Sequence, residues 1–353
     1  MRHLLQASCR AIISGAALAL LASCGQASST GGASGLSPTL AVMRPTVHPD
    51  HGTPWMAPEA RDAKMLLYVG DEDKTNDVFI YDFPSGKAVG KLTGFDGPSG
   101  LCVDAAGDVY VPNLMNGTTV EYAHGGTKVL NTYDAGGVSI GCSVDSKGDL
   151  AVTNYEGTMT VYAGGKSNRG TRYTDSSCGG DWQPAGYDDK GNLYLEGVNA
   201  SNGVVICELP ADSTSMRVVS SSGIGIGNAG AVTWDGKYLV LSGNPIGSGS
   251  QGSELLVRVT EGADGSLQAV SDTQLVDSCY DGYVDIPLPF ILGEKNTPVN
   301  RVQGHTVLGP NTWCTNSGYS KVEYWKYPKG GAPFAQLSNP PNAPDGAVVS
   351  IAE

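Results

Sequence analysis

The sequence predicts an all-β protein, a six-bladed β-propeller closed by its N- and C-terminal strands in one blade. The first observation is an internal repeat: Gly141–Gly165, GCSVDSKGDLAVTNYEGTMTVYAGG, has a second copy at Gly100–Gly126, GLCVDAAGDVYVPNLMNGTTVEYAHGG. The second is that each repeat holds four short strand candidates within about 40 to 50 residues, the size of a propeller blade. The third is that incomplete repeats stand at the two ends of the chain.

Residues 1–23 have the layout of a bacterial lipoprotein signal peptide. Basic Arg2 and Arg10 precede or adjoin the apolar run Ala11–Leu21, which is shorter than the roughly 20 residues that a membrane-spanning helix needs. Leu21–Cys24 resembles a lipobox, and the resemblance implies cleavage before Cys24 and lipidation of its thiol. Gly25 stands where an inner-membrane retention signal would have Asp. We therefore expect an anchored protein of the outer membrane, facing the periplasm or the surface.

The chain without its leader is strongly acidic. Removing Arg2 and Arg10 from the 22 Lys+Arg of the sequence leaves 20, against 35 Asp+Glu, a net charge of about −15. Nucleic acids and anionic lipids both require Lys and Arg to neutralise phosphates. We predict no nucleic-acid partner, attachment to the membrane through lipidated Cys24, and a monomer.

Six cysteines remain outside the leader and the lipobox, an even number that suggests disulfides in an exported protein. The predicted pairs are Cys279–Cys314 within one repeat, Cys102–Cys142 between neighbouring repeats, and Cys178–Cys207 by elimination. The second pair is the less secure. Cys102 stands two residues before its Asp and Cys142 three before, so on ideal strands their side chains face opposite ways.

Two segments separate the predicted signal peptide from the first strand. Residues 24–37, rich in Gly, Ser and Ala, are predicted to be a flexible tether. Residues 38–64, richer in proline and containing Trp55, are predicted to be an extended arm along the propeller, which we place at residues 65–353. His48 and His51 form an H-x-x-H pair in the arm, but no helix places them on one face, so we expect no metal there.

The blades then follow in order. Strand candidates of the second and third repeats are Leu101–Val103, Val109–Val111, Thr119–Tyr122, Lys128–Asn131, Cys142–Val144, Leu150–Thr153, Met159–Tyr162 and Gly170–Tyr173. Later repeats begin at Ala185, Ala231 and Tyr283. Met65–Leu92 supplies the second, third and fourth strands of a blade, and Pro344–Ile351 supplies a first strand. Together they make the closing blade, which removes unpaired sheet edges.

Short acidic segments such as Asp-Ser-Lys-Gly-Asp at Asp145–Asp149 join the first and second strands of each repeat. The Gly supplies a positive φ and the Asp can accept hydrogen bonds from nearby backbone amides. We interpret them as hairpin turns and not as calcium ligands.

The segment Pro98–Asp104 and its continuation to Asn113 closely match the pattern that opens each blade in propellers of the NHL and streptogramin-lyase-like superfamily. The chain resembles this superfamily from about Trp55 to Ala352, and more narrowly a group of exported bacterial proteins. The resemblance implies the propeller fold. It implies little about function, because propellers host unrelated activities.

A ring of polar residues is the strongest candidate site in the sequence. An acidic or amide side chain stands in the loop before each first strand, and these loops should surround one mouth of the central channel. Such oxygen atoms could hold a cation such as Ca²⁺, or bind a small polar ligand with two aromatic side chains as stacking surfaces. The candidates are Asp96, Asp134, Asp181, Trp182, Asn228, Tyr280, Asp281 and Asp345.

The function predicted from these features is that of a lipid-anchored envelope propeller that binds a ligand or a protein at its face. We find no catalytic residues: the sequence has no Gly-x-Ser-x-Gly elbow, and His124 and His305 lie in predicted turns or strand starts. The alternative is a lactonase- or lyase-type enzyme that uses a divalent metal at the channel mouth.

Overall fold

The structure is a computed structural model that describes residues 52–72, 75–165, 169–247, 253–276, 284–285, 305–308 and 321–352. All of them belong to one compact unit of the chain, Pro45–Glu353. The described residues contain three short 3₁₀ helices, η1 (Pro58–Arg61), η2 (Ala163–Gly165) and η3 (Ser176–Cys178), and no α-helix. No helix in the described part of the chain is long and apolar enough to cross a membrane.

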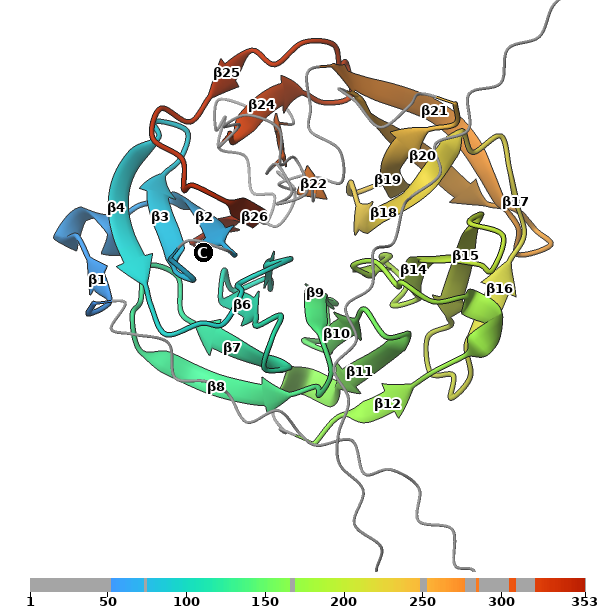
Figure 1. Cartoon of the computed structure of the whole chain (residues 1–353), viewed down its shortest axis with the longest axis horizontal. Helices are drawn as coiled ribbons and strands as arrows, with labels where there is room; N and C mark the ends of the chain where they lie inside the picture. Colours follow the sequence, from blue (N-terminus) through green and yellow to red (C-terminus); the bar gives the residue numbers. More distant parts are fainter. Residues whose placement is uncertain are drawn as a thin grey trace, which may run out of the picture. The chain divides into compact units, whose positions relative to one another are not determined.

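The strands form separate sheets arranged around a centre, as in a propeller (Figure 1). Sheet 1 contains, from the centre outward, β26 (Pro344–Ile351), β2 (Met65–Asp71), β3 (Val78–Asp82), β4 (Lys87–Leu92) and β1 (Trp55–Met56). Sheet 2 contains β5 (Cys102–Val103), β6 (Val109–Pro112), β7 (Thr118–Tyr122) and β8 (Val129–Asp134). Sheet 3 contains β9 (Ser139–Val144), β10 (Leu150–Asn154), β11 (Thr158–Tyr162) and β12 (Thr171–Tyr173).

The longest strands are in sheet 5, and sheet 6 lies in the least described part of the chain. Sheet 4 contains β13 (Gly186–Tyr187), β14 (Leu193–Val198), β15 (Val204–Leu209) and β16 (Arg217–Val219). Sheet 5 contains β18 (Ile226–Trp234), β19 (Leu239–Pro245), β20 (Ser253–Glu261), β21 (Leu267–Val276) and β17 (Ser221–Ser222). Sheet 6, described only in part, contains β22 (Val284–Asp285), β23 (His305–Leu308), β24 (Glu323–Lys326) and β25 (Ala335–Gln336).

The predicted all-β propeller is therefore confirmed, with sheets 1 to 5 described over most of their length. The predicted strands of sheets 2 and 3 are all present, with ends that differ by up to three residues. In sheet 1 the C-terminal strand β26 pairs antiparallel with the N-terminal strand β2, from Met65–Ile351 to Asp71–Pro344. The arm contributes β1, which pairs with β4 and adds a fifth strand that the repeat pattern did not predict.

Sheet 1 is buried on both faces, which explains the continuous apolar run in its second strand, β2. In β2, Leu66 and Tyr68 pack in a cluster with Leu101 and Val109 of sheet 2. Leu67 and the other alternate residues of β2 pack instead with Val322 and Tyr324, next to sheet 6. Successive residues of a strand point to opposite faces, so one strand seals two interfaces between sheets.

The acidic segments between first and second strands are hairpin turns, as predicted. The Oδ1 atom of Asp145 accepts hydrogen bonds from the backbone N–H groups of Lys147 and Asp149, both at 2.8 Å. Gly148 has a φ of 82°, a backbone angle that residues other than glycine rarely adopt. Asp104 and Asp188 accept from their own turns in the same way.

Candidate functional site

The first strands of sheets 1 to 5 surround a central cavity of about 390 Å³. Each of these strands, β26, β5, β9, β13 and β18, stands at the inner end of its sheet and pairs with a neighbour on one side only. Their other edges, with backbone N–H and C=O groups, therefore face inward. A cavity of this size lies within the range of small-molecule sites, roughly 300–1,000 Å³.

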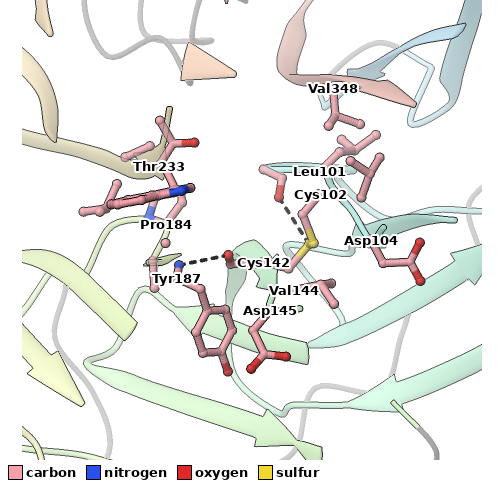
Figure 2. Close-up of a pocket in the computed structure, with 18 of the residues that line it drawn as sticks. Leu101, Cys102, Asp104, Cys142, Val144, Asp145, Pro184, Tyr187, Thr233 and Val348 are labelled. Atoms are coloured by element: carbon pink, nitrogen blue, oxygen red, sulfur yellow. Dashed lines mark hydrogen bonds between the residues drawn. A yellow bond between two sulfur atoms is a disulfide. The ribbon is translucent and has the colours of Figure 1, made fainter. Parts of the chain in front are cut away.

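The wall of the cavity is mostly aliphatic. Figure 2 shows one side chain from each of the five sheets around it: Val348, Leu101, Val144, Pro184 and Thr233. Among the described residues that line it there is no Lys, Arg or His, whereas four acidic residues lie near the turns at one end. These are Asp104, Asp145, Asp188 and Asp189.

The turn carboxylates do not fill the cavity. Figure 2 shows the side chains of Asp104 and Asp145 directed outward, away from its middle. One oxygen of each is already engaged by backbone amides of its own turn. Their charge thus contributes a negative field at this end of the cavity without a carboxylate standing in the middle of it.

Glycines allow the first strands to approach one another closely at the other end. A Cβ atom on Gly186 would lie 2.3 Å from the carbonyl oxygen of Val232, and one on Gly100 would lie 2.1 Å from that of Ile140. Backbone hydrogen bonds cross between sheets at this level, from Cys142 N to Gly100 O at 3.2 Å, for example. The repeat pattern therefore needs Gly at these positions, because a Cβ atom would overlap the backbone of the neighbouring sheet around the cavity.

A disulfide between Cys102 and Cys142 stands in the cavity wall and joins β5 to β9 (Figure 2). The second predicted pair in the described chain, Cys178–Cys207, is also present and joins η3 to β15. Both predictions are confirmed. The third predicted pair, Cys279–Cys314, lies outside the described residues.

The predicted polar ring is not part of this cavity. None of its described members lines the cavity, and Asp134, Asp181 and Asn228 are exposed on loops or strand ends. Asp96 is half-buried, and Tyr280 and Asp281 lie outside the described residues. No group of three or more His, Cys, Asp or Glu side chains in the described ranges is placed to hold a metal ion.

Two members of that ring require correction because they are buried. Trp182 is fully buried in the core cluster of sheets 3 and 4, and its Nε1 donates to the backbone oxygen of Gly179 at 3.2 Å. Its ring therefore offers no stacking surface. Asp345 is 3% exposed, and burial together with the neighbouring Glu72 carboxylate raises its pKa well above the ordinary value.

A buried glutamate on β14 is a polar group that the sequence analysis missed. Glu196 is fully buried, and its Oε2 accepts a hydrogen bond from Gly230 N of β18 at 2.9 Å. Its Oε1 has no hydrogen-bond partner among the described residues. Burial raises its pKa well above the ordinary value, although the Gly230 hydrogen bond acts in the opposite direction. In the sequence, Glu196 stands within an apolar strand, and nothing there indicated that its side chain is buried against β18.

We expect Glu196→Gln to change how stability depends on pH. A raised pKa in the folded state means that the folded protein binds this proton more tightly than the unfolded chain, so the contribution of Glu196 is favourable below about pH 4.5. It is lost as pH rises toward the folded-state pKa. Urea unfolding at several pH values should show that the free energy of unfolding of the variant increases relative to that of the wild type as pH rises. A difference that is constant from pH 4 to pH 8 would contradict a raised pKa.

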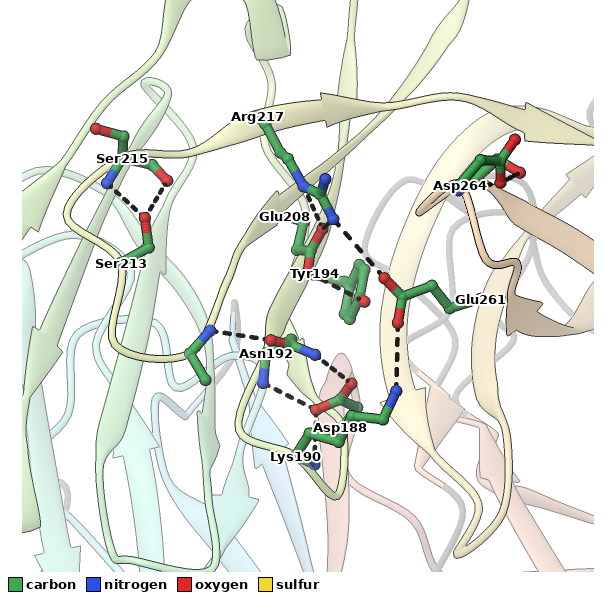
Figure 3. A network of polar contacts seen from close by, with 12 residues as sticks. Asp188, Lys190, Asn192, Tyr194, Glu208, Ser213, Ser215, Arg217, Glu261 and Asp264 are labelled. Atoms are coloured by element: carbon green, nitrogen blue, oxygen red, sulfur yellow. Dashed lines mark hydrogen bonds and ion pairs between the residues drawn. The ribbon is translucent and has the colours of Figure 1, made fainter.

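A network of charged side chains connects sheets 4 and 5 at their outer part (Figure 3). Arg217 binds the nearly buried Glu208 at 2.6 Å and lies 3.7 Å from Glu261, which also pairs with Lys190 at 3.3 Å. Tyr194 donates to Glu208 at 3.3 Å. Each of these charges has a partner of opposite sign, so the network ties β14, β15 and β16 to β20.

Fold and cavity together define an all-β propeller with a mostly aliphatic central cavity. No protein-family model matches the chain, and no curated protein matches its sequence.

Several solved structures are similar to this chain at low sequence identity. They include a streptogramin B lyase (13% identity, TM-score 0.42, 66% of this chain and 69% of that one). A putative 6-phosphogluconolactonase from Bacteroides fragilis is similar at 13% identity with a TM-score of 0.48, covering 83% of this chain and 99% of that one. Kuenenia stuttgartiensis hydrazine synthase is similar at 14% identity with a TM-score of 0.44, covering 70% of each chain.

Proposed function

We propose that the protein is a lipid-anchored binding protein of the bacterial cell envelope that takes a small ligand into its central cavity. The observation that carries the proposal is the cavity itself, about 390 Å³ in volume and walled by the first strands of sheets 1 to 5. The ligand class follows from the wall. Aliphatic side chains favour an apolar body, and inward-facing strand edges can bond a few polar groups.

The charges around the cavity favour a neutral or cationic ligand over an anion. Four acidic residues and no basic residue are among its described lining. An anionic ligand would have to lose its hydration without gaining a compensating cation, which costs several kcal/mol. A compact, uncharged or positively charged molecule is therefore the class that we propose.

The proposal includes a ring of six blades closed by both ends of the chain. Six sheets among the described residues, the last described in part, support the number. The pairing of β26 with β2 supports the closure, because opening the ring would expose the backbone groups of two strands. A closed ring holds the first strands at fixed distances, which a preformed cavity requires.

Export and anchoring complete the proposal. Two disulfides in the described residues support an oxidising compartment. The lipobox-like Leu21–Cys24 and the tether at residues 24–37 support lipidation of Cys24 and attachment to the outer membrane. Intact-mass analysis of the protein extracted from the envelope tests this directly, since a diacylglyceryl group on Cys24 adds a defined mass that Cys24→Ala removes.

Native mass spectrometry tests the cavity. We expect the full chain, extracted in detergent, to carry a co-purifying small molecule that Val144→Phe abolishes, because the larger side chain fills space between β9 and its neighbours. Val218→Phe is the matched control, since Val218 is exposed on β16. An adduct that survives Val144→Phe, or the absence of any adduct in the wild type, would overturn the proposed cavity site.

The same preparation separates binding from the alternative, a divalent-metal lactonase or lyase with Ca²⁺ or a similar ion at the channel mouth. The polar ring of Asp96, Asp134, Asp181 and its partners would have to supply the ligands. Calorimetric titration with Ca²⁺, followed by an assay of lactone hydrolysis, distinguishes the two functions. Heat of Ca²⁺ binding together with turnover of the lactone would favour the enzyme over the binding protein.

A further inference from the structure

The two disulfides of the described chain differ in what surrounds them. Cys102 and Cys142 line the central cavity and are 8% and 7% exposed. Cys178 and Cys207 are both 0% exposed and belong to the core cluster that contains Trp182. Thiol–disulfide exchange begins when a thiolate reaches one of the two sulfur atoms, so its rate depends on access. The cavity therefore offers a route to the first bond, whereas packed side chains enclose the second.

The cavity reaches the surface at the end where the hairpin turns lie. Ala105, Ser146 and Asp189 line it there, and all three residues are exposed. Cys102 precedes Ala105 by three residues, about 10 Å of extended chain, and Figure 2 shows its bond to Cys142 in the cavity wall. The volume of about 390 Å³ is enough for a small molecule. A small thiol can therefore enter the cavity and approach the bond.

The reduced form of Cys142 has hydrogen-bond partners ready in this wall. Its Sγ lies 3.7 Å from the carbonyl oxygen of Gly100 and 3.8 Å from that of Tyr110. A thiol at this place can donate a weak hydrogen bond to either oxygen. Buried polar groups cost least when they are paired. The wall can therefore hold Cys142 as a thiol as well as in the disulfide.

The disulfide joins two first strands, β5 and β9, whose other contacts lie toward the glycine end of the cavity. There Cys142 N donates to Gly100 O at 3.2 Å, and Ser99 Oγ donates to Ile140 O at 3.2 Å. Reduction would keep these two hydrogen bonds and remove the covalent link. We therefore expect the two strands to loosen toward the turn end, where the cavity opens to solvent.

The charge of the cavity favours some thiols over others. Asp104 follows Cys102 by two residues, and Asp145 follows Cys142 by three. Four acidic residues and no basic residue are among the described lining. Such a field repels a thiolate that also carries a carboxylate and attracts one that also carries an ammonium group.

We propose that the Cys102–Cys142 bond is a thiol-sensitive redox switch, which small thiols open from inside the cavity with a preference for cationic over anionic ones. One thiolate forms a mixed disulfide with one cysteine and releases the other as a thiolate, which takes up a proton. A second thiol then displaces the first. Two thiols become one disulfide, and the two electrons and two protons that they lose convert Cys102 and Cys142 into thiols.

The switch regulates the cavity, and one part of it rests on the proposed binding function. A ligand in the cavity shields the bond from thiols, and opening of the bond releases the ligand because β5 and β9 loosen. Access of thiols to the bond and the preference for cationic thiols require no ligand. The two parts therefore need separate measurements.

Differential alkylation with peptide mapping measures how fast each disulfide of the full chain is reduced. Cysteamine, 2-mercaptoethanol and 3-mercaptopropionate are compared at low salt, and each rate is divided by the rate of the same thiol with hydroxyethyl disulfide. Cys102–Cys142 should open about tenfold faster than Cys178–Cys207 or more, because the buried bond reacts only after local opening. The normalised rate with cysteamine should exceed that with 3-mercaptopropionate about tenfold, and by less than about threefold at 0.5 M salt.

Two matched pairs of variants test the route through the cavity. Val144→Phe should slow reduction of the cavity bond about tenfold by restricting access, and Val218→Phe, on exposed β16, should not. Asp189→Asn should lower the preference for cysteamine about twofold, whereas Asp62→Asn, exposed and outside the lining, should leave it unchanged.

Equal reduction rates of the two disulfides, or equal normalised rates with the three thiols, would overturn the switch. So would a folded Val144→Phe variant that is reduced as fast as the wild type, with circular dichroism as the check of folding. The charge preference is measured on the wild type, so it tests the switch even where Val144→Phe fails to fold.

Hydrogen–deuterium exchange of the selectively reduced protein measures the effect on the wall. Peptides from β5 and β9 should exchange faster than in the oxidised protein, whereas peptides from β19 and β20 should not change. Unchanged exchange in β5 and β9 would overturn the switch. Native mass spectrometry of the same samples should show loss of the co-purifying molecule on reduction, and an adduct that survives would overturn ligand release. Charge-selective reduction with faster exchange in a protein that carries no ligand would remove the binding function and support the switch.

Discussion

Gly186→Ala is expected to lower the free energy of unfolding by about 3 kcal/mol, the upper part of the usual range for overpacking a close contact. The new Cβ would lie 2.3 Å from Val232 O and 2.7 Å from the carbonyl carbon of Val232. Both are backbone atoms, which cannot rotate away as a side chain can. The first strand of sheet 4 would have to move away from that of sheet 5, and the cavity wall would open with it.

Gly180→Ala is the matched control for this change. Gly180 lies just before the same sheet, a Cβ added to it would meet no atom within 4 Å, and its φ is not positive. We expect the variant to be neutral or slightly stabilising, because alanine reduces the conformational entropy of the unfolded chain. Urea and thermal unfolding measure both variants. Equal stability of the two would show that sheets 4 and 5 are not in close contact at Gly186.

Removal of the disulfide in the cavity wall is the second change that should destabilise the protein strongly. Cys102→Ser with Cys142→Ser should cost about 3–4 kcal/mol, the chain-entropy value for a loop closed over 40 residues. This corresponds to a lower melting temperature by several degrees. The bond also joins β5 to β9, so two neighbouring sheets lose their covalent link beside the cavity.

Cys178→Ser with Cys207→Ser is the comparison. That bond closes a loop of 29 residues, and neither of its cysteines lines the cavity. Its expected cost is similar, about 3–4 kcal/mol, but loss of the cavity ligand should accompany only the Cys102 and Cys142 change. Non-reducing peptide mapping checks the pairs themselves. Free thiols at Cys102 and Cys142 would contradict the link, and a third cross-linked peptide would support the predicted Cys279–Cys314 pair.

The fold could be predicted because its signal is repeated along the chain. Asp104, Asp145 and Asp188 each accept amide hydrogen bonds within a turn of similar form. Every such turn joins a first strand to a second, so the repeat length shows directly how much chain one sheet uses. Local chemistry suffices for this prediction, since a turn depends on residues within a few positions of one another.

The Cys102–Cys142 bond shows where an argument from one strand fails. The one-residue difference in their positions makes the two side chains point to opposite faces of their own sheets, which at first counts against a bond. In a ring of sheets, the face of sheet 2 that points toward sheet 3 packs against the face of sheet 3 that points back toward sheet 2. Opposite directions are therefore what brings the two sulfur atoms together, and their Cα atoms lie 5.5 Å apart.

The candidate site was predicted less well than the fold. Loops before the first strands carry Asp and Asn in most repeats, yet Trp182 and Asp345 are buried, and the described members of that ring do not line the cavity. The cavity is lined instead by residues such as Val144 and Thr233, which look like ordinary strand residues in the sequence. Nothing local distinguishes an inward-facing edge from any other strand edge.

Short-range spacing that recurs along the chain was enough to predict the all-β class, the repeat and the turn chemistry. Two features emerged only from the folded arrangement: what the first strands enclose and the burial of Glu196 against Gly230. Those features join residues 34 or more positions apart, and their contact depends on how whole sheets pack around a centre, which local spacing does not encode.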